Sequence, residues 1–329
     1  MADKRPLRFG VLGAARIAPD ALIKPAHEVP DVEVTAIAAR DPARAREFAN
    51  AHNIPRVHAT YTDLVNDPEL DVIYNPLPNS LHCAWSIAAL RAGKHVLCEK
   101  PIASNAAEAE RMAIVARETG RLLGEAFHYS YHPLAERVRK LLRDGAIGRL
   151  THLEGKFSVP IPSTNIRYDW SLAGGATMDL GCYPLHMLRN FSGLTPRVSR
   201  AAARTGPPNI DIAMDVDLEL NGGVSAHMSC SMAQDAKLFI AFSARGESGE
   251  LNVANPVAPH RGHLLTLKTA DGEKKETVPG DATFTHQLRA FAAAVRGGAK
   301  FPTDGAEGIL NMRLIDEVYR AAGLPPRGT

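Results

Sequence analysis

The sequence has few cysteines, and no pattern joins them. Its 329 residues include only Cys83, Cys98, Cys182 and Cys230, which form no Cys-x-x-Cys pair. A disulfide framework or a cysteine-rich zinc site is therefore not expected, and a reducing compartment, the cytoplasm, is the predicted location. The segment APHRGH has two histidines beside an arginine but no third ligand nearby, so no metal site is predicted.

An excess of one charge and long apolar runs are also missing. The formal net charge is +2 at pH 7, and no Lys/Arg cluster is interleaved with aromatic residues, so nucleic acid is not an expected partner. The basic runs ARDPARAR and ERVRKLLR fall on predicted helices, where we expect solvated faces. No apolar run is long enough to span a bilayer, and MADKRPLRFGVLG has no apolar signal core, so no membrane association is predicted.

The first part of the chain alternates strand-like and helix-like segments. Its length of 329 residues exceeds the usual size of one hydrophobic core, so two domains are expected. Over residues 1–126, short apolar strands such as LRFGVLG, LDVIYN and HVLCEK alternate with helices. We expect Asp41 and Ser104 to cap two of these helices at their N-termini. Repeated β–α units predict a doubly wound parallel sheet with helices on both faces, which is a Rossmann domain.

The second part, residues 127–329, has longer strands and hairpin signals. The turns NGG and ADGE favour antiparallel pairing, so an α+β domain with a large, mostly antiparallel open sheet is predicted. Helices can cover only one face of such a sheet. Because the other face commonly becomes a subunit interface, we expect a homodimer or homotetramer formed through this sheet.

The turn after the first strand, GAARIA, has a position suited to phosphate binding. A strand, a tight turn and a helix N-terminus form the usual dinucleotide site, with the pattern GxGxxG. Here Gly13 is followed by Ala15 and Ala18 in place of the second and third glycines. We expect Gly13, Ala15, Arg16 and Ile17 to contact a cofactor. The alternative is an ordinary turn between a strand and a helix.

The end of the second strand points to the kind of dinucleotide. NAD-binding units normally place an acidic residue there, but this strand ends with Ala39 and Arg40, and Arg44 follows in the next helix. Arginine suits a 2′-phosphate, through paired charge-assisted hydrogen bonds and by stacking on adenine. NADP is therefore predicted rather than NAD. The alternative is that Arg40 is a surface residue beside Asp41.

Three segments carry a resemblance to a known family. NPLPNSLH, AGKHVLCEKP and AGGATMDLGCYPLH resemble the Gfo/Idh/MocA oxidoreductases, and these landmarks occur in order over essentially the whole chain. The resemblance implies a Rossmann domain, a second domain built on a large sheet, and an active site between them. Tyr183 stands where the common family pattern has histidine. This departure resembles the branch of dimeric dihydrodiol dehydrogenase, glucose–fructose oxidoreductase and NADP-dependent xylose dehydrogenases.

In that branch a lysine and a tyrosine form the catalytic pair, which implies Lys100 and Tyr183 here. Lys100 follows a strand of the parallel sheet, at the edge where ligands bind, and Pro101 restricts the backbone after it. We expect Tyr183 to be the general acid/base and Lys100 to polarise the developing alkoxide. Asp179 would orient a second substrate hydroxyl or position Lys100. Asp179 and Tyr183 are four residues apart on a helix that Pro184 is expected to kink.

Further cofactor contacts are expected at strand ends and in one loop. The residues concerned are Pro76, Leu77, Asn79, His82, Glu99 and Trp170. His82 would alternatively cap its helix, and Trp170 would alternatively anchor a packed loop. The roles of His128 and His186 stay open: a position in the cleft and a place in a hinge or core are both compatible with His128.

The predicted function is an NADP(H)-dependent oxidoreductase. It would move a hydride to or from a hydroxyl or carbonyl carbon of a sugar, a cyclic polyol or a trans-dihydrodiol. One alternative is a non-catalytic regulator that senses a ligand through the same fold. Another is a lyase or glycosidase that oxidises its substrate transiently and recycles the cofactor. The joint presence of Lys100, Asp179 and Tyr183 argues against the regulator.

Overall fold

The computed structural model describes residues 5–207 and 209–328, which form two compact units. The first unit is the chain up to Phe127 together with Phe284–Leu310. The second unit is His128–Thr283 together with the chain from Asn311 onward. This division differs from the expected boundaries, 1–126 and 127–329, by the segment Phe284–Leu310. In that segment Phe291 packs edge-to-face on Phe9 of the first unit, with ring centroids 6.1 Å apart.

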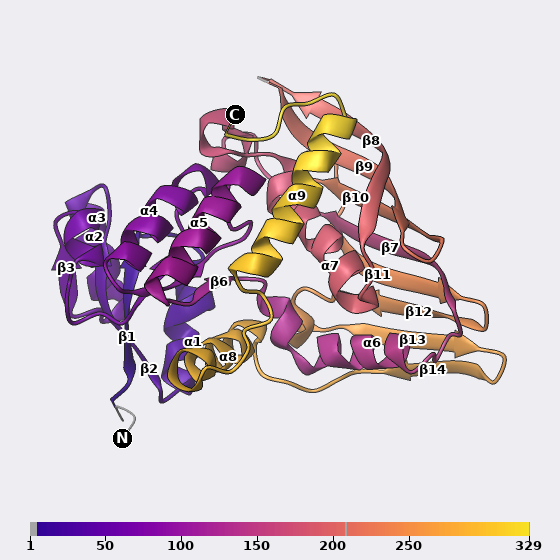
Figure 1. The fold of residues 1–329 in the computed structure, drawn as a ribbon, viewed down its shortest axis with the longest axis horizontal. Helices are drawn as coiled ribbons and strands as arrows, with labels where there is room; N and C mark the ends of the chain where they lie inside the picture. Colours follow the sequence, from indigo (N-terminus) through magenta and orange to yellow (C-terminus); the bar gives the residue numbers. More distant parts are fainter. Residues whose placement is uncertain (1–4, 208, 329) are drawn as a thin grey trace. The chain divides into compact units, whose positions relative to one another are not determined.

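The first unit contains a six-stranded parallel sheet in the order β3-β2-β1-β4-β5-β6 (Figure 1). This is the order of a Rossmann fold, so the predicted fold of the first domain is confirmed. Its strands are β1 (Leu7–Leu12), β2 (Val32–Ala38), β3 (Arg56–His58), β4 (Val72–Asn75), β5 (His95–Cys98) and β6 (Leu123–Glu125). Its helices are α1 (Lys24–Glu28), α2 (Pro42–His52), α3 (Tyr61–Val65), α4 (Asn79–Arg91), α5 (Ala106–Thr119) and α8 (Thr283–Gly297), of which only the first residue, Thr283, belongs to the second unit.

The helix caps of the first unit follow local side-chain chemistry. Asp41 caps α2 as predicted, because its carboxylate accepts hydrogen bonds from the backbone N–H groups of Ala43 and Arg44. The expected cap of α5 is wrong by one residue. Asn105, which is extended, accepts from the N–H of Glu108 at 3.0 Å and is the N-cap, so Ser104 lies outside the helix.

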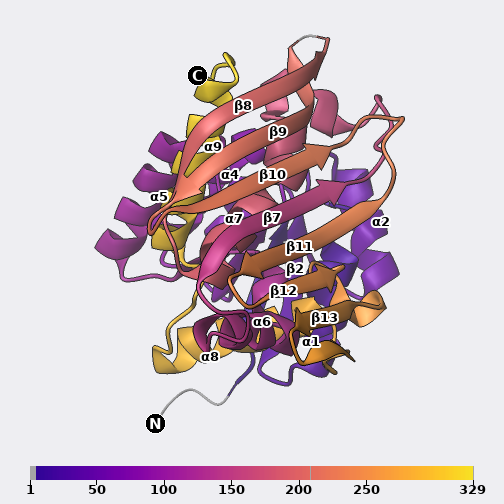
Figure 2. The same ribbon diagram turned by 90° about the vertical axis from the view of Figure 1, so that its right-hand side faces the viewer.

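The second unit contains an eight-stranded sheet in the order β14-β13-β12-β11-β7-β10-β9-β8 (Figure 2). All neighbours pair antiparallel except β7 and β10, which are parallel, so the predicted mostly antiparallel sheet is confirmed. The NGG and ADGE turns join β9 to β10 and β13 to β14. Its strands are β7 (Leu150–Ser158), β8 (Pro196–Gly206), β9 (Ile210–Leu220), β10 (Val224–Ser231), β11 (Phe239–Gly246), β12 (Gly249–Ala254), β13 (Leu264–Thr269) and β14 (Gly272–Glu276).

One face of this sheet is apolar and covered by helix. Buried residues alternate with more exposed ones along β7 and β10, as expected of a sheet packed on one side only. The helix α7 (Cys182–Ser192) crosses β7 at Gly155, where an added Cβ would approach Pro184 to 2.7 Å. The helix α9 (Gly305–Ala321) begins in the first unit and ends in the second.

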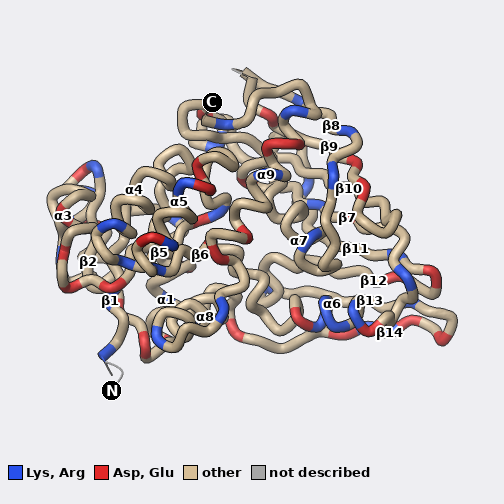
Figure 3. Tube along the Cα trace, viewed as in Figure 1, with Lys and Arg blue, Asp and Glu red and all other residues tan. Residues whose placement is uncertain are grey.

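The basic helix of the second unit forms a solvated face, as predicted. In α6 (Pro133–Arg143), Arg137 pairs with Glu276 of β14, and Arg139 and Lys140 pair with acidic residues on α6 or just beyond its end. Figure 3 shows these basic and acidic segments meeting along α6 and β14. In the described part of the chain, no helix combines the length and apolar character needed to cross a membrane.

Pro184 lies inside a continuous helix, as expected, and the irregularity next to it is a π-helical turn. The π-helical turn Thr177–Gly181 runs directly into α7, and Pro184 is the third residue of α7. A proline inside a helix removes one backbone donor and its ring clashes with the preceding turn, so a wider π-helical turn just before it replaces the regular hydrogen bonds there. The same arrangement occurs in the first unit, where the π-helical turn Pro19–Ile23 precedes α1 and Pro25 is its second residue.

Candidate active site

The first unit brings most of the predicted cofactor residues to one edge of its sheet. The strands β2, β1, β4 and β5 are neighbours, and the residues after their carboxyl ends are those the sequence selects. They are Gly13, Ala15, Arg16 and Ile17 after β1, Ala39 and Arg40 after β2, Pro76 and Leu77 after β4, and Glu99 and Lys100 after β5.

The turn at Gly13 is packed tightly against its neighbours. Gly13 has φ +83° and its N–H donates to the carbonyl of Ala38 at 2.7 Å. The backbone at Gly13 therefore favours glycine, and a Cβ there would also approach Leu77 to a tight 3.1 Å. Arg16 and Ile17, in contrast, are exposed. The turn therefore has a closed inner side and an open outer side where a ligand can approach.

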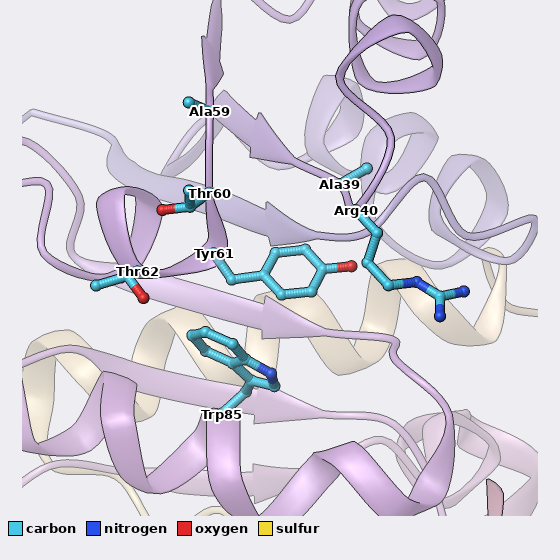
Figure 4. A pocket seen from close by; sticks show the side chains of 7 residues that line it. All are labelled: Ala39, Arg40, Ala59, Thr60, Tyr61, Thr62 and Trp85. Carbon is cyan, nitrogen blue, oxygen red and sulfur yellow. The ribbon is translucent and has the colours of Figure 1, made fainter.

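An open hollow of about 330 Å³ lies beside the end of β2 (Figure 4). Its lining consists of Ala39, Arg40, Ala59, Thr60, Tyr61, Thr62 and Trp85, a set without a carboxylate. The rings of Tyr61 and Trp85 meet edge-to-face with centroids 5.0 Å apart, and the Tyr61 hydroxyl points toward Arg40. Burial raises the pKa of Tyr61, while the charge of Arg40 opposes this shift, so the phenol is neutral near pH 7.

The two arginines after β2 have different surroundings. Arg44 donates from Nη2 to the carbonyl oxygen of Ala14 at 3.0 Å, which ties α2 to the glycine turn. Arg40 is exposed at the rim of the hollow. The carboxylate of Asp41 is engaged by backbone N–H groups as the cap of α2.

His82 joins the two loops that follow β4 and β5. Its side chain is buried, with Nε2 2.7 Å from the carbonyl oxygen of Leu77 and Nδ1 2.9 Å from that of Pro101. Burial lowers the pKa of His82 to about 4, so the ring is neutral and donates its single N–H to one of these carbonyls. His82 lies inside α4 and is not its cap, and its ring positions the two loops. The cofactor contact expected of His82 stays a prediction.

The segment that carries Lys100 is held on both sides. Glu99 is buried and accepts a hydrogen bond from the Tyr74 hydroxyl at 2.8 Å and one from the Lys100 N–H at 3.3 Å. Beyond the cis peptide Lys100–Pro101, the N–H of Ile102 donates to the carboxylate of Glu125 at 2.8 Å. The Lys100 side chain is half-buried on this fixed backbone. Asn79, the first residue of α4, lies near the same loop, and its carbonyl accepts from Ser104 Oγ at 3.5 Å.

In the second unit, Tyr183 of α7 lies in an aromatic environment and is 6% exposed. Its ring centroid is 5.4 Å from that of Phe157, 6.0 Å from that of Tyr129 and 6.1 Å from that of His128. The Tyr183 hydroxyl is 3.3 Å from His128 Nε2. His186, also on α7, is fully buried, and its Nδ1 lies 2.5 Å from the Tyr129 hydroxyl. Because burial lowers the pKa of His186 well below its usual range, His186 is a neutral core residue.

Asp179 forms an ion pair within the second unit. Its Oδ2 is 2.5 Å from Nε of Arg167, which lies on the short 3₁₀ helix Ile166–Tyr168. The turn between them needs two glycines. A Cβ on Gly174 would come within 2.3 Å of the Arg167 carbonyl oxygen, and one on Gly175 within 2.2 Å of Asp211 Oδ1.

A buried arginine near the C-terminus secures the same turn. Arg327 is 0% exposed, its Nη2 is 2.5 Å from Asp211 Oδ1, and its Nε donates to the Gly174 carbonyl at 2.7 Å. Its guanidinium carbon lies 4.2 Å from the centroid of Trp170 and 4.3 Å from that of Tyr319. One face of Trp170 is therefore covered by Arg327, so this tryptophan anchors its loop at least in part.

Comparison with known proteins identifies the family. Residues 7–127 match the model described as an oxidoreductase family with an NAD-binding Rossmann fold, and residues 135–252 match the GFO/IDH/MocA C-terminal domain. This chain belongs to the Gfo/Idh/MocA oxidoreductases. The resemblance stated from the sequence is thereby confirmed.

Individual relatives of this Gfo/Idh/MocA oxidoreductase span its whole length. D-xylose 1-dehydrogenase (NADP⁺) 2 of Haloferax volcanii is 35% identical, with 96% of this chain and 97% of the relative covered. Trans-1,2-dihydrobenzene-1,2-diol dehydrogenase of Sus scrofa is 33% identical, with 97% of each covered. The crystal structure of a 3-ketoreductase from Actinomadura kijaniata with NADP and TDP-benzene has a TM-score of 0.90 at 31% identity, covering 96% of this chain and 98% of that one.

Several residues around the candidate site of this Gfo/Idh/MocA oxidoreductase were not identified from the sequence. Tyr61 and Trp85 join Arg40 only because α3 and α4 flank the end of β2. Arg327 joins Asp211 across most of the second unit, and no local pattern marks either residue. Among the described residues, no group of three or more His, Cys, Asp or Glu could hold a metal ion.

Proposed function

We propose that this chain is an NADP(H)-dependent oxidoreductase that transfers a hydride to or from a hydroxyl or carbonyl carbon of a sugar, a cyclic polyol or a trans-dihydrodiol. The observation that carries the proposal is the presence, in a chain of this family, of Lys100 on a segment fixed by hydrogen bonds and of Tyr183 with its buried hydroxyl beside His128. Its relatives include an NADP-dependent xylose dehydrogenase, a dihydrodiol dehydrogenase and a sugar-nucleotide 3-reductase.

The residues at the sheet edge of the first unit fit NADP. The hollow beside β2 offers aromatic rings and an exposed guanidinium and has no carboxylate in its lining, so it suits adenosine with a 2′-phosphate. In this proposal Arg40 binds the phosphate, and the backbone turn at Gly13, Ala15, Arg16 and Ile17 faces the pyrophosphate. Pro76, Leu77, Asn79, Glu99 and Trp170 would complete the cofactor site, with Ala39 and Arg44 beside Arg40.

Bound NADP(H) supplies or accepts the hydride, and the chain supplies the proton and the charge. Tyr183 donates a proton to the substrate oxygen during reduction or removes it during oxidation. Lys100, as an ammonium, stabilises the alkoxide that develops on that oxygen. Asp179, oriented by Arg167, accepts a hydrogen bond from a neighbouring substrate hydroxyl. Each of these roles belongs to one side chain, so a substitution at that residue can test it.

A spectrophotometric screen tests the proposed activity. Purified protein is mixed with NADP and aldoses, cyclic polyols or trans-diols, and NADPH absorbance is followed, with Tyr183→Phe as the control. The expected result is net NADPH formation with at least one polyhydroxy substrate, at a rate about 100- to 10,000-fold lower with Tyr183→Phe. A regulator would bind NADP without forming NADPH, and a redox-recycling lyase would consume substrate without accumulating NADPH.

Two further proposals concern the assembly and the setting of the protein. We propose a homodimer or homotetramer through the outer face of the eight-stranded sheet, where half-exposed Glu154, Lys156 and His227 alternate with buried residues. Light scattering after gel filtration would test it, since a monomer contradicts the proposal. All four cysteines are free thiols, which favours the cytoplasm as the location.

A further inference from the structure

A row of three buried polar side chains ends at the Tyr183 hydroxyl. His128 Nε2 is 3.3 Å from that hydroxyl, and His128 Nδ1 is 2.8 Å from Oγ1 of Thr283. Tyr183 is 6% exposed, His128 is 5% exposed and Thr283 is 0% exposed. They come from three separate parts of the second unit. Neither the sequence motifs nor the mechanism above uses His128 or Thr283.

We propose that His128, set by Thr283, is a positioning residue that donates a hydrogen bond to the Tyr183 oxygen. The inference rests on the proposed role of Tyr183 as the general acid/base. A tyrosine that gives its proton to a substrate directs its O–H away from its neighbours in the protein. Its oxygen then accepts a hydrogen bond, and the negative charge left after proton transfer makes that bond stronger.

The geometry selects one tautomer for this task. Neutral imidazole has one N–H and one acceptor nitrogen. If Nε2 carries the proton and donates to Tyr183, then Nδ1 must accept, and the hydroxyl of Thr283 is placed to donate to it. The hydrogen bonds then run in one direction, from Thr283 to His128 to Tyr183 and onward to the substrate. When Tyr183 becomes a phenolate, no heavy atom in this row needs to move.

The packing around Tyr183 holds His128 in place for this task. The ring of His128 stands edge-to-face with that of Tyr183, at an interplanar angle of 69°. The hydroxyl of Tyr129, whose ring also packs on Tyr183, is engaged by His186 Nδ1 at 2.5 Å. Phe157 packs on Tyr183 as well and has no polar atom in its side chain. The row is therefore built into the core of the second unit and does not depend on exposed side chains.

Two matched pairs of variants test the row. Thr283→Val removes the hydroxyl at nearly constant shape, whereas Thr283→Ser keeps it. In His128→Gln, the side-chain amide lies near the position of Nε2 and can still donate to Tyr183. In His128→Asn, the shorter side chain places its amide near the position of Nδ1, so the donor to Tyr183 is lost. We expect Thr283→Val and His128→Asn to lower kcat about ten- to a hundredfold with unchanged KM values, while Thr283→Ser and His128→Gln stay within about threefold of wild type.

A third comparison separates positioning from folding. In a Tyr183→Phe background, His128→Asn is expected to cause no further loss of kcat, because His128 acts only through the tyrosine oxygen. The inference is overturned if Thr283→Val and His128→Asn keep wild-type kcat, or if Thr283→Ser loses as much as Thr283→Val. It is also overturned if His128→Asn lowers kcat again in the Tyr183→Phe background. Wild-type turnover in Tyr183→Phe itself would instead refute the proposed function.

Discussion

The two units of this protein hold their functional residues in different ways. In the first unit the candidate residues follow consecutive neighbours in a parallel sheet, and backbone groups fix them: Gly13 N–H to Ala38, and His82 to the carbonyls of Leu77 and Pro101. In the second unit, side chains from distant segments do this work, as in the pair Arg327–Asp211. In the first unit, the order of the strands brings the candidate residues together at one edge of the sheet. In the second unit, polar contacts between side chains position them.

This difference has a consequence for mutation. A change at the sheet edge should alter cofactor affinity with little effect on folding, because the exposed side chains there do not support the backbone. A change in the buried contacts of the second unit should alter stability or turnover more than cofactor affinity. The following predictions can break or sharpen that comparison.

The largest effect is expected from the catalytic pair, one member in each unit. Tyr183→Phe and Lys100→Met should each lower kcat/KM about 100- to 10,000-fold while leaving NADP affinity nearly intact. The double variant should be no worse than the poorer single variant, because both residues act on the same oxygen. Steady-state kinetics and fluorescence titration with NADP measure this. Multiplicative losses in the double variant would show that the residues act independently.

The next effect is expected from the buried ion pair of the second unit. Arg327→Met leaves the carboxylate of Asp211 buried without its cation, and both residues are 0% exposed. The free energy of unfolding should fall by about 3–5 kcal/mol in urea denaturation, and adding Asp211→Asn should recover part of it. The NADP affinity of the native protein should fall far less than its stability, although Arg327 also packs on Trp170, a proposed cofactor contact. A loss of NADP affinity comparable to the loss of stability would contradict the division between the units.

A pH effect is expected in the first unit. Burial lowers the pKa of His82 from its ordinary 6.5 to about 4, so the unfolded chain binds a proton between these values that the folded chain does not. The free energy of unfolding should therefore fall as pH drops from about 6.5 to about 4, by at most about 3 kcal/mol from this residue. His82→Gln should flatten this part of the profile. His27→Gln, at an exposed position of α1, is the control and should leave the profile unchanged.

The smallest of these effects is expected at the rim of the hollow. Arg40→Ala should raise KM for NADP about ten- to a hundredfold and change KM for NAD little, because only NADP has the 2′-phosphate. The control is Arg46→Ala, at an exposed position of α2. Equal losses with NADP and NAD would place Arg40 outside the 2′-phosphate site. Thermal stability should be unchanged in both variants.

The sequence was sufficient for the architecture and for the edge of the parallel sheet. Strand and helix periods, the cap at Asp41 and the NGG and ADGE turns are local signals, and the residues after each strand follow from them. The cap of α5 was misplaced because Ser104 and Asn105 are both good caps, and only backbone geometry selects Asn105. The sequence indicated an irregular helix at Pro184 but not its form, because a π-helical turn has no marker in composition.

The contacts of the second unit were beyond sequence reasoning for a physical reason. His128, Tyr183 and Thr283 meet only after the large sheet and α7 have formed, and none lies within a helical or strand period of another. The same is true of Arg167 with Asp179 and of the buried pair Arg327 with Asp211, which come together only in the folded second unit. Side-chain contacts at long sequence separation leave no local pattern in the sequence. A motif can therefore identify Tyr183 but not the residues that orient its side chain.

A crystal structure with NADP and a bound sugar or diol tests the central claim most directly. We expect Lys100 Nζ and Tyr183 Oη to lie both within about 3 Å of the substrate oxygen, on the carbon that faces the nicotinamide. A complex in which these two groups line different pockets, with only one of them near the reacting carbon, would contradict the proposed mechanism.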